Sequence, residues 1–305
     1  MASSRRAGTN ERKWDGDSWE VGVNTFGTAG AGRDYTAISL WETDTDVDIV
    51  TATVSPVLEC YNDAASYDLG GAVVFVGATV NTTYFRILRA HSTTRHLGVS
   101  GAGVVFDGSS SLSLGETDFG VEDIEVRRSV NNANPRLAVE AAATRGRIVG
   151  VLAKGVNTGA GTGLGIYNSA NVTVYIVNCI AFESDDVNIG QRNGVVYNCT
   201  AVNGGGYGFS YTTTEPAYKN CIGYNNTGGD WNTAGGASGT DYNLSKDATV
   251  PASAHHVHGT LTFNNAGADD YRLTSTDTDA IGAGASLAAD ATFAFDDDIA
   301  FTVRS

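Results

Sequence analysis

The segment from residue 175 to residue 224 reads "YIVNCIAFESDDVNIGQRNGVVYNCTAVNGGGYGFSYTTTEPAYKNCIGY" and repeats one short phrase three times. The phrase centres on an Asn-Cys pair, and the three pairs are Asn178-Cys179, Asn198-Cys199 and Asn220-Cys221. Their spacings are 20 and 22 residues. A helical hairpin repeat needs about 34 residues, so this period is too short for one. The period suits one coil of a parallel β-solenoid with three short strands.

Stacking of such coils predicts a role for each member of the pair. Parallel strands of neighbouring coils lie about 4.8 Å apart, so equivalent residues form ladders along the axis. Asn tolerates the positive φ of a tight turn, so we expect the three Asn residues to form a turn ladder. A buried Cys behaves as a small hydrophobe, so we expect the three Cys residues to be inert core thiols. Parallel side chains make disulfide geometry hard to reach, and a straight ladder offers no tetrahedral zinc site.

Two further phrases extend the pattern toward both ends of the chain. "GRDYTAISLWE" spans Gly32–Glu42, and "DDYRLTSTDTDAIGAGA" spans Asp269–Ala285. With these phrases and the Asn-Cys rungs, the chain resembles the right-handed parallel β-helix family, the pectate-lyase-like superfamily that also includes phage tailspikes. The resemblance covers roughly residues 30 to 300. In the closing phrase Thr278-Asp279 stands where the family commonly has Ser-Pro, and Gly282 stands where it has Asp.

This resemblance implies an all-β fold, a right-handed parallel β-helix with three-strand coils of about 20–28 residues, a short N-terminal capping helix and a C-terminal β cap. It implies little about function, because this superfamily hosts unrelated activities. We expect residues 1–30 to form an N-terminal arm with a basic tip, residues 31–250 the β-helix and residues 251–305 the C-terminal cap. The arm is either a disordered tail or an arm that docks onto neighbouring virion proteins.

The chain is strongly acidic, with 34 Asp and Glu against 19 Lys and Arg in 305 residues and a formal net charge of -15. An acidic surface repels polyanions, so we expect no nucleic-acid partner, and a polyanionic sugar would need bridging cations. No apolar run is long enough to span a membrane, and the first residues lack the apolar core of a secretory signal peptide. We therefore expect no membrane partner, and a virion location or an extracellular one after lysis.

The paired carboxylates Asp185 and Asp186 are the first candidates for chemistry. They resemble the paired aspartates of polygalacturonases, and glycoside hydrolysis uses two carboxylates. The rest of that family's pattern is missing, because the Gly204–Gly208 stretch has no Gly-His-Gly and no Arg-x-Lys occurs anywhere. A solvated turn or a weak calcium site is the alternative, and we expect no other cofactor. A lyase would need a Lys or Arg base, for which Arg192 is a candidate without a visible acid partner.

Two other groups of side chains are candidates for binding. His256 and His258 would share one face of a strand and could supply half of a metal site. Tyr207, Tyr211 and Trp231 could form a platform on which a sugar ring stacks. Each group also has an alternative without a binding role. The histidines would then form only a surface cluster, and the aromatic residues would be strand residues on a pleated surface.

These features favour a virion-type structural protein, namely a capsid decoration, tailspike or fibre component, with host or environmental glycans as candidate ligands. We expect a homo-oligomer, with a trimer favoured, and a role that is not enzymatic. One alternative is a polysaccharide lyase or glycoside hydrolase that acts along a groove of the β-helix. The other is a non-catalytic glycan-binding adhesion module.

Overall fold

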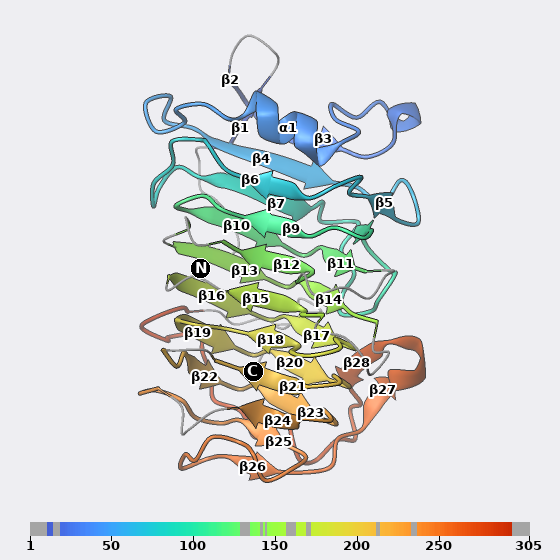
Figure 1. Cartoon of the computed structure of the whole chain (residues 1–305), viewed down its shortest axis with the longest axis vertical. Helices are drawn as coiled ribbons and strands as arrows, with labels where there is room; N and C mark the ends of the chain where they lie inside the picture. Colours follow the sequence, from blue (N-terminus) through green and yellow to red (C-terminus); the bar gives the residue numbers. More distant parts are fainter. Residues whose placement is uncertain are drawn as a thin grey trace.

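The computed structural model describes residues 11–14, 19–128, 135–140, 143, 145–156, 163–168, 172–211, 214–232 and 237–294. In this part of the chain three sheets run along one long axis, and successive strands pass from one sheet to the next (Figure 1). The predicted all-β fold and right-handed parallel β-helix are confirmed. Among the residues described, no helix is both long enough and apolar enough to cross a membrane.

Sheet I contains ten strands and includes the described part of the N-terminal arm. Its strands are β1 (Glu11–Trp14), β2 (Trp19–Val21), β3 (Asn24–Phe26), β4 (Ser55–Cys60), β7 (Arg86–Ala90), β10 (Phe119–Glu122), β13 (Arg145–Val149), β16 (Thr173–Val177), β19 (Gly194–Tyr197) and β22 (Ala217–Lys219). Strand β1 pairs with β2 in antiparallel fashion, and both β1 and β3 pair with β4 in parallel fashion. Residues 1–10 lie outside the described residues, so docking of the arm onto a neighbouring protein stays a prediction.

Sheets II and III complete each coil. Sheet II comprises β5 (Tyr67–Asp68), β8 (Val105–Asp107), β11 (Glu125–Arg127), β14 (Leu152–Lys154), β17 (Ile180–Phe182), β20 (Thr200–Val202), β23 (Ile222–Tyr224), β25 (Leu244–Ser245) and β26 (Val257–His258). Sheet III comprises β6 (Val73–Phe75), β9 (Leu112–Leu114), β12 (Leu137–Val139), β15 (Ile166–Asn168), β18 (Ile189–Gly190), β21 (Tyr207–Ser210) and β24 (Gly229–Asn232). All pairs within these two sheets are parallel.

The turn from sheet I to sheet II has one residue with positive φ in each of six successive coils. These residues are Asp123, Gly150, Asn178, Asn198, Asn220 and Tyr242, with φ between 54° and 64°. Asn is common in this left-handed region because its short polar side chain can hydrogen-bond locally. The side-chain amide of Asn198 donates to the side-chain oxygen of Asn178, so neighbouring turns are tied together along the axis.

The residue after each Asn turns into the solenoid interior. Cys179, Cys199 and Cys221 are fully buried and form no disulfide, as is also true of Cys60. The backbone N–H of Cys179 donates to the sulfur of Cys199 at 3.4 Å. Burial raises the pKa of the Cys199 thiol well above its ordinary value, which keeps it protonated at neutral pH.

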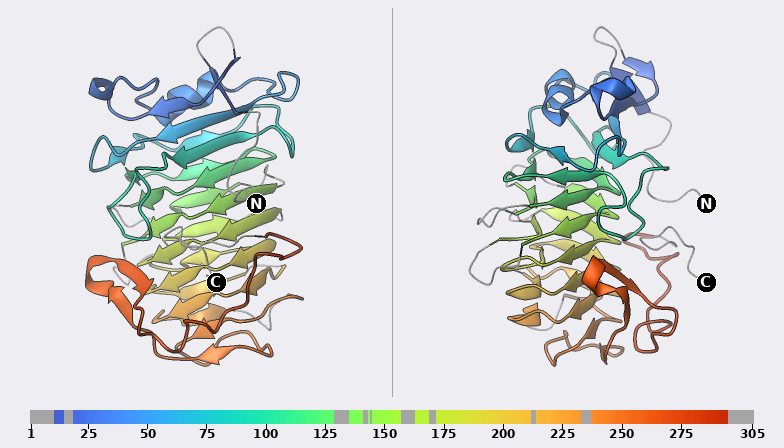
Figure 2. Two further views of the ribbon diagram at one scale, coloured as in Figure 1. Left: turned by 180° about the vertical axis from the view of Figure 1, so that it is seen from behind. Right: turned by 90° about the vertical axis from the view of Figure 1, so that its right-hand side faces the viewer.

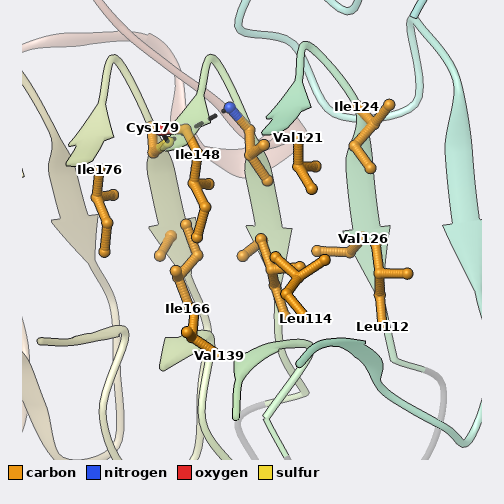
Figure 3. Close-up of a cluster of buried hydrophobic side chains, with 14 of the residues drawn as sticks. Leu112, Leu114, Val121, Ile124, Val126, Val139, Ile148, Ile166, Ile176 and Cys179 are labelled. Carbon is orange, nitrogen blue, oxygen red and sulfur yellow. Dashed lines mark hydrogen bonds between the residues drawn. The ribbon is translucent and has the colours of Figure 1, made fainter. Parts of the chain in front are cut away.

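Aliphatic side chains from all three sheets fill the interior. Leu112 and Val139 from sheet III, Val121 and Ile148 from sheet I, and Val126 from sheet II point toward one another (Figure 3). Since side chains alternate between the two faces of a strand, every second residue of these short strands contributes to this core. The core is therefore continuous from coil to coil.

The short helix α1 (Ile38–Asp44) lies against the first coils, as expected for an N-terminal capping helix (Figure 1). Its Ile38 and Trp41 are buried. The buried guanidinium of Arg86 donates to the carbonyl oxygen of Glu42 at 2.7 Å and pairs with the buried carboxylate of Glu116. One arginine thus ties the end of the helix to β7 and to the turn that follows β9. The short 3-10 helix η1 (Ala29–Ala31) precedes α1.

The C-terminal segment packs along the side of the β-helix rather than across its end. We call residues 259–294 the strap; it contains the antiparallel strands β27 (Phe263–Asn265) and β28 (Asp270–Leu273), joined by η2 (Ala266–Ala268). Figure 2 shows it, in orange to red, beside the stacked coils.

The strap covers apolar residues on the outer faces of two sheets. On sheet II, Tyr271 packs with Leu152 and Phe182, and on sheet I, Leu287 packs with Val177 and Tyr197. Between these contacts, Ala285 exchanges two hydrogen bonds with the side-chain amide of Asn220, at 2.8 and 2.9 Å. Within the cap expected over residues 251–305, residues 259–294 therefore form a lateral cover, because the outward side chains of sheets I and II are apolar there.

The positive φ at Asn198 predicts that substitution by Ala lowers stability more than substitution by Gly. Asn198→Ala should lower the free energy of unfolding by about 1–3 kcal/mol, because Ala disfavours positive φ and loses the amide hydrogen bond. Asn198→Gly keeps the backbone conformation at no steric cost and should be the milder change. Thermal unfolding followed by circular dichroism measures both. Equal stability of wild type and the Ala variant would contradict this role.

Candidate functional site

A pocket of about 390 Å³ opens where the strap meets the edge of sheet II. It is lined by Lys154, Gly155, Val156, Glu183 and Asn203. These residues come from the ends of three successive strands, β14, β17 and β20, and from the turns that follow them. Two strap residues, Asp269 and Tyr271, contact the lining residues from the outside. We refer to these seven residues as the strap pocket.

The backbone places the pocket residues at equivalent points of neighbouring coils. Glu183 and Asn203 directly follow β17 and β20, and both have positive φ, 56° and 55°. Lys154 ends β14 and pairs with Phe182 of β17. At Gly155 the next coil approaches so closely that a Cβ atom would overlap the carbonyl oxygen of Glu183. Only glycine fits this close approach.

One ammonium group and two carboxylates meet in the pocket. The Lys154 ammonium pairs with the Asp269 carboxylate and lies 3.8 Å from an oxygen of Glu183. The side chains of Lys154 and Glu183 are 28% and 32% exposed, so both can be reached from solvent. The three formal charges sum to one negative charge.

Tyr271 supplies a hydroxyl and an apolar surface beside these charges. The side-chain amide of Asn203 donates to its hydroxyl oxygen at 3.0 Å. Its ring packs against Phe182 with 5.0 Å between centroids. Burial raises the pKa of Tyr271 to about 12, so the phenol stays protonated at neutral pH; the residue is 2% exposed, and its hydroxyl contacts the pocket lining through Asn203.

The environment of Glu183 favours its neutral form. Burial is the largest cause that raises the pKa of its carboxyl, and the negative charge of Asp269 adds to the effect. The Lys154 ammonium opposes both. A carboxyl with a raised pKa can donate a proton, and beside it Asp269 can accept one or bind a ligand hydroxyl.

The sequence-predicted catalytic candidates lie before and after one short strand of sheet III. Asp185 is 5% exposed and, with the half-buried Asp186, lies in the turn before β18. Arg192 lies in the turn after β18, at the other end of the strand. The short strand β18 thus lies between the two carboxylates and the arginine.

The histidine pair lies near the end of the solenoid. The rings of His256 and His258 are 5.6 Å apart between centroids. Each ring has its Nδ1 atom 2.7 Å from a backbone carbonyl oxygen, that of Ser253 or Asp247. Within the described ranges, no cluster of three or more His, Cys, Asp or Glu side chains could hold a metal ion, so a site at this pair or at Asp185 and Asp186 stays a prediction.

The predicted aromatic platform is wrong for Trp231. This ring is 2% exposed and stacks on Phe209 inside the solenoid, with 4.2 Å between centroids. Trp231 occupies the interior position of β24 because it is in register with the inward Phe209 of β21. Tyr207 and Tyr211 are half-buried and lie at opposite ends of β21. The three rings therefore do not form one exposed surface.

Sequence reasoning missed the strap pocket because its parts are far apart along the chain. Lys154 and Asp269 are separated by 115 residues. The scarcity of lysine, with only four in the chain, could have singled out Lys154. The closing phrase that begins at Asp269 contains the other two polar groups, since it continues into Tyr271. Nothing in the spacing of either segment indicates that they touch.

Comparison with known proteins gives one similar structure. No known family matches the chain, and no curated protein matches it. Among solved structures, the chain is similar to the crystal structure of pectate lyase Pel9A, with 13% sequence identity and a TM-score of 0.41. The alignment covers 84% of this chain and 90% of that chain.

The raised pKa of Glu183 predicts a pH-dependent effect of Glu183→Gln. A raised pKa in the folded state stabilises the fold at pH values below the ordinary value of about 4.3, and this stabilisation is lost as pH rises through the folded value. Gln mimics the neutral carboxyl, so the variant and wild type should be equally stable near pH 4, and the variant more stable at pH 7. Thermal unfolding across this range measures the difference.

The control is Glu140→Gln, which removes one negative charge from an exposed glutamate outside the strap pocket. A wild type that is more stable than Glu183→Gln at pH 7 would contradict the assignment. In that case the pairing of Glu183 with Lys154 would outweigh the burial of its carboxyl.

Proposed function

We propose that the protein is a structural β-helix of the virion type that binds a glycan residue in the strap pocket without cleaving it. The observation that carries the proposal is the set of polar groups in the pocket. A Lys154 ammonium and a Tyr271 hydroxyl can donate, and the carboxylates of Glu183 and Asp269 can accept. Sugar hydroxyls both donate and accept hydrogen bonds, so such a mixed set suits them.

The charge of the pocket narrows the class of sugar. Two carboxylates face one ammonium group, and the chain as a whole has a formal net charge of -15. Both features repel uronate polymers. We therefore expect a neutral sugar or an amino sugar. The two carboxylates would accept hydrogen bonds from its hydroxyl or ammonium groups.

Exposed apolar residues at the N-terminal end of the β-helix support the proposal that the protein assembles with other chains. Leu40, Val47, Val74 and Val76 are large apolar residues with exposed side chains. Hydrogen bonds join their segments, from the Val76 N–H to the Glu42 carboxylate and from the Thr79 N–H to the Val47 carbonyl. Apolar residues gathered at one end favour contact with another protein, and a trimer remains our expectation. A chain that stays monomeric at micromolar concentration in mass photometry would contradict it.

Glycan binding is tested with a glycan array followed by calorimetry on the strongest ligand. Tyr271→Phe removes one hydroxyl and should weaken binding about fivefold to tenfold, the effect of one lost hydrogen bond. Lys154→Met removes the ammonium and should weaken binding by about tenfold or more, since hydrogen bonds to charged groups are stronger. Lys246→Met is the matched control, because Lys246 bonds to Asn225 at 3.0 Å outside the pocket.

Three outcomes separate the alternatives. Binding that falls in both pocket variants and persists in Lys246→Met supports the proposal. Absence of binding across the array, or equal binding by all variants, contradicts it. Release of reducing ends by wild type that is lost in Glu183→Gln would instead indicate a glycoside hydrolase, with Glu183 as the acid and Asp269 as its partner.

A further inference from the structure

Two buried arginines lie at the edge between sheets II and III, on the side where Asp185 lies. Arg128 directly follows β11, and Arg136 directly precedes β12, so both belong to one coil. Their exposed fractions are 3% and 1%. Arginine is almost never fully buried unless its charge is paired, so these two positions need a physical explanation.

Arg136 uses few of its donors within the part of the chain that the structure describes. Its Nε atom donates to the carbonyl oxygen of Lys154 at 3.4 Å, in the next coil. Its Nη1 and Nη2 atoms are buried and have no hydrogen-bond partner there. A buried donor without a partner costs free energy, and more so when it carries charge. Both terminal nitrogens of the guanidinium could therefore donate hydrogen bonds to a ligand.

Two charged groups in the described part of the chain act on Arg136, one positive and one negative. Burial and the nearby positive charge of Arg128 lower the pKa of Arg136 to about 10, and Asp185 opposes them. Arg136 therefore remains protonated at neutral pH. Two guanidinium groups thus lie close to the carboxylate of Asp185. Arg128 also donates to the carbonyl oxygen of Ser109 at 3.1 Å, which holds it beside the preceding coil.

We propose that Arg136, with Arg128 beside it, binds one oxyanion, a carboxylate, sulfate or phosphate, through its two terminal nitrogens. The planar fork of a guanidinium matches two oxygens of such a group. Both guanidinium groups would also attract the negative charge of the oxyanion. This site shares no side chain with the strap pocket and favours the opposite charge, so it is independent of the proposed glycan binding.

Burial of Arg136 predicts how the anion behaves. Because both terminal nitrogens are inaccessible to solvent, the anion should be taken up as the chain folds and should exchange slowly. It should therefore stay with the purified protein. Native mass spectrometry of the intact chain should detect one bound oxyanion per chain, and its mass identifies it.

The second measurement is refolding in defined anions. Protein unfolded in urea and freed of small ions is refolded in chloride, sulfate, phosphate, acetate or glucuronate at one ionic strength. We expect at least one oxyanion at about ten times its Kd to raise the Tm by about 2–4 °C over chloride. A shift with sulfate or phosphate indicates a free inorganic ion, whereas a shift with glucuronate alone indicates the acidic group of a sugar.

Substitution at Arg136 decides whether the shift arises there. Arg136→Met replaces the charge by an apolar chain and should abolish both the bound mass and the anion-dependent shift. In chloride alone it should be at least as stable as wild type, because the substitution removes a buried charge and two buried donors that have no hydrogen-bond partner among the described residues. Arg192→Met, at the other edge of sheet III, should keep the full shift. If Arg136→Met does not fold, Arg136→Lys, which loses the fork, replaces it.

The proposal is wrong if wild type carries no oxyanion and its Tm is the same in every anion. It is also wrong if the Arg136 variant shows the wild-type shift, because the effect would then be a general one of salt. A shift that is lost in Arg136→Met and kept in Arg192→Met supports it.

Discussion

The parallel, in-register stacking of each coil on the one before it is the constraint on which the structure depends. Hydrogen bonds between successive strands place equivalent residues directly above one another in all three sheets. The left-handed residue between sheets I and II keeps that register, because each coil turns at the same point. A residue type suited to one coil is then suited to the next, which explains why the Asn-Cys pair recurs.

The same stacking creates rows of outward side chains as well as a core. Where those rows are apolar, on sheets I and II, the strap covers them with residues such as Tyr271 and Leu287. The strap pocket forms at the margin of this cover, where the hairpin ends and the polar residues after β14, β17 and β20 begin. The proposed ligand site therefore depends on a segment that is added to the solenoid from outside.

Features that depend on contacts between neighbouring coils could be predicted from the sequence, whereas features that depend on contacts between distant segments could not. The repeat of Asn178-Cys179 with its two successors indicates the coil length, the turn position and the inward thiol, because neighbouring coils are close in sequence. Trp231 could not be assigned to a face in this way, since Gly229, the first residue of β24, has a φ of 120°, which obscures which face of the strand points inward. The approach of Asp269 to Lys154 depends on the path of the strap, and the burial of Arg136 depends on the coils around it. Neither is encoded in a local pattern.

We infer that the strap is a separate cover and that the β-helix is stable without its contacts. Hydrogen exchange of Tyr271→Ala compared with wild type tests this most directly. Tyr271 packs against Phe182 and Phe263 and anchors the hairpin to sheet II. We expect faster deuterium uptake in residues 263–273 and unchanged uptake in the interior strands β16, β17, β19 and β20. Faster uptake throughout those interior strands would contradict it, because the strap would then be part of the fold that holds the coils in register.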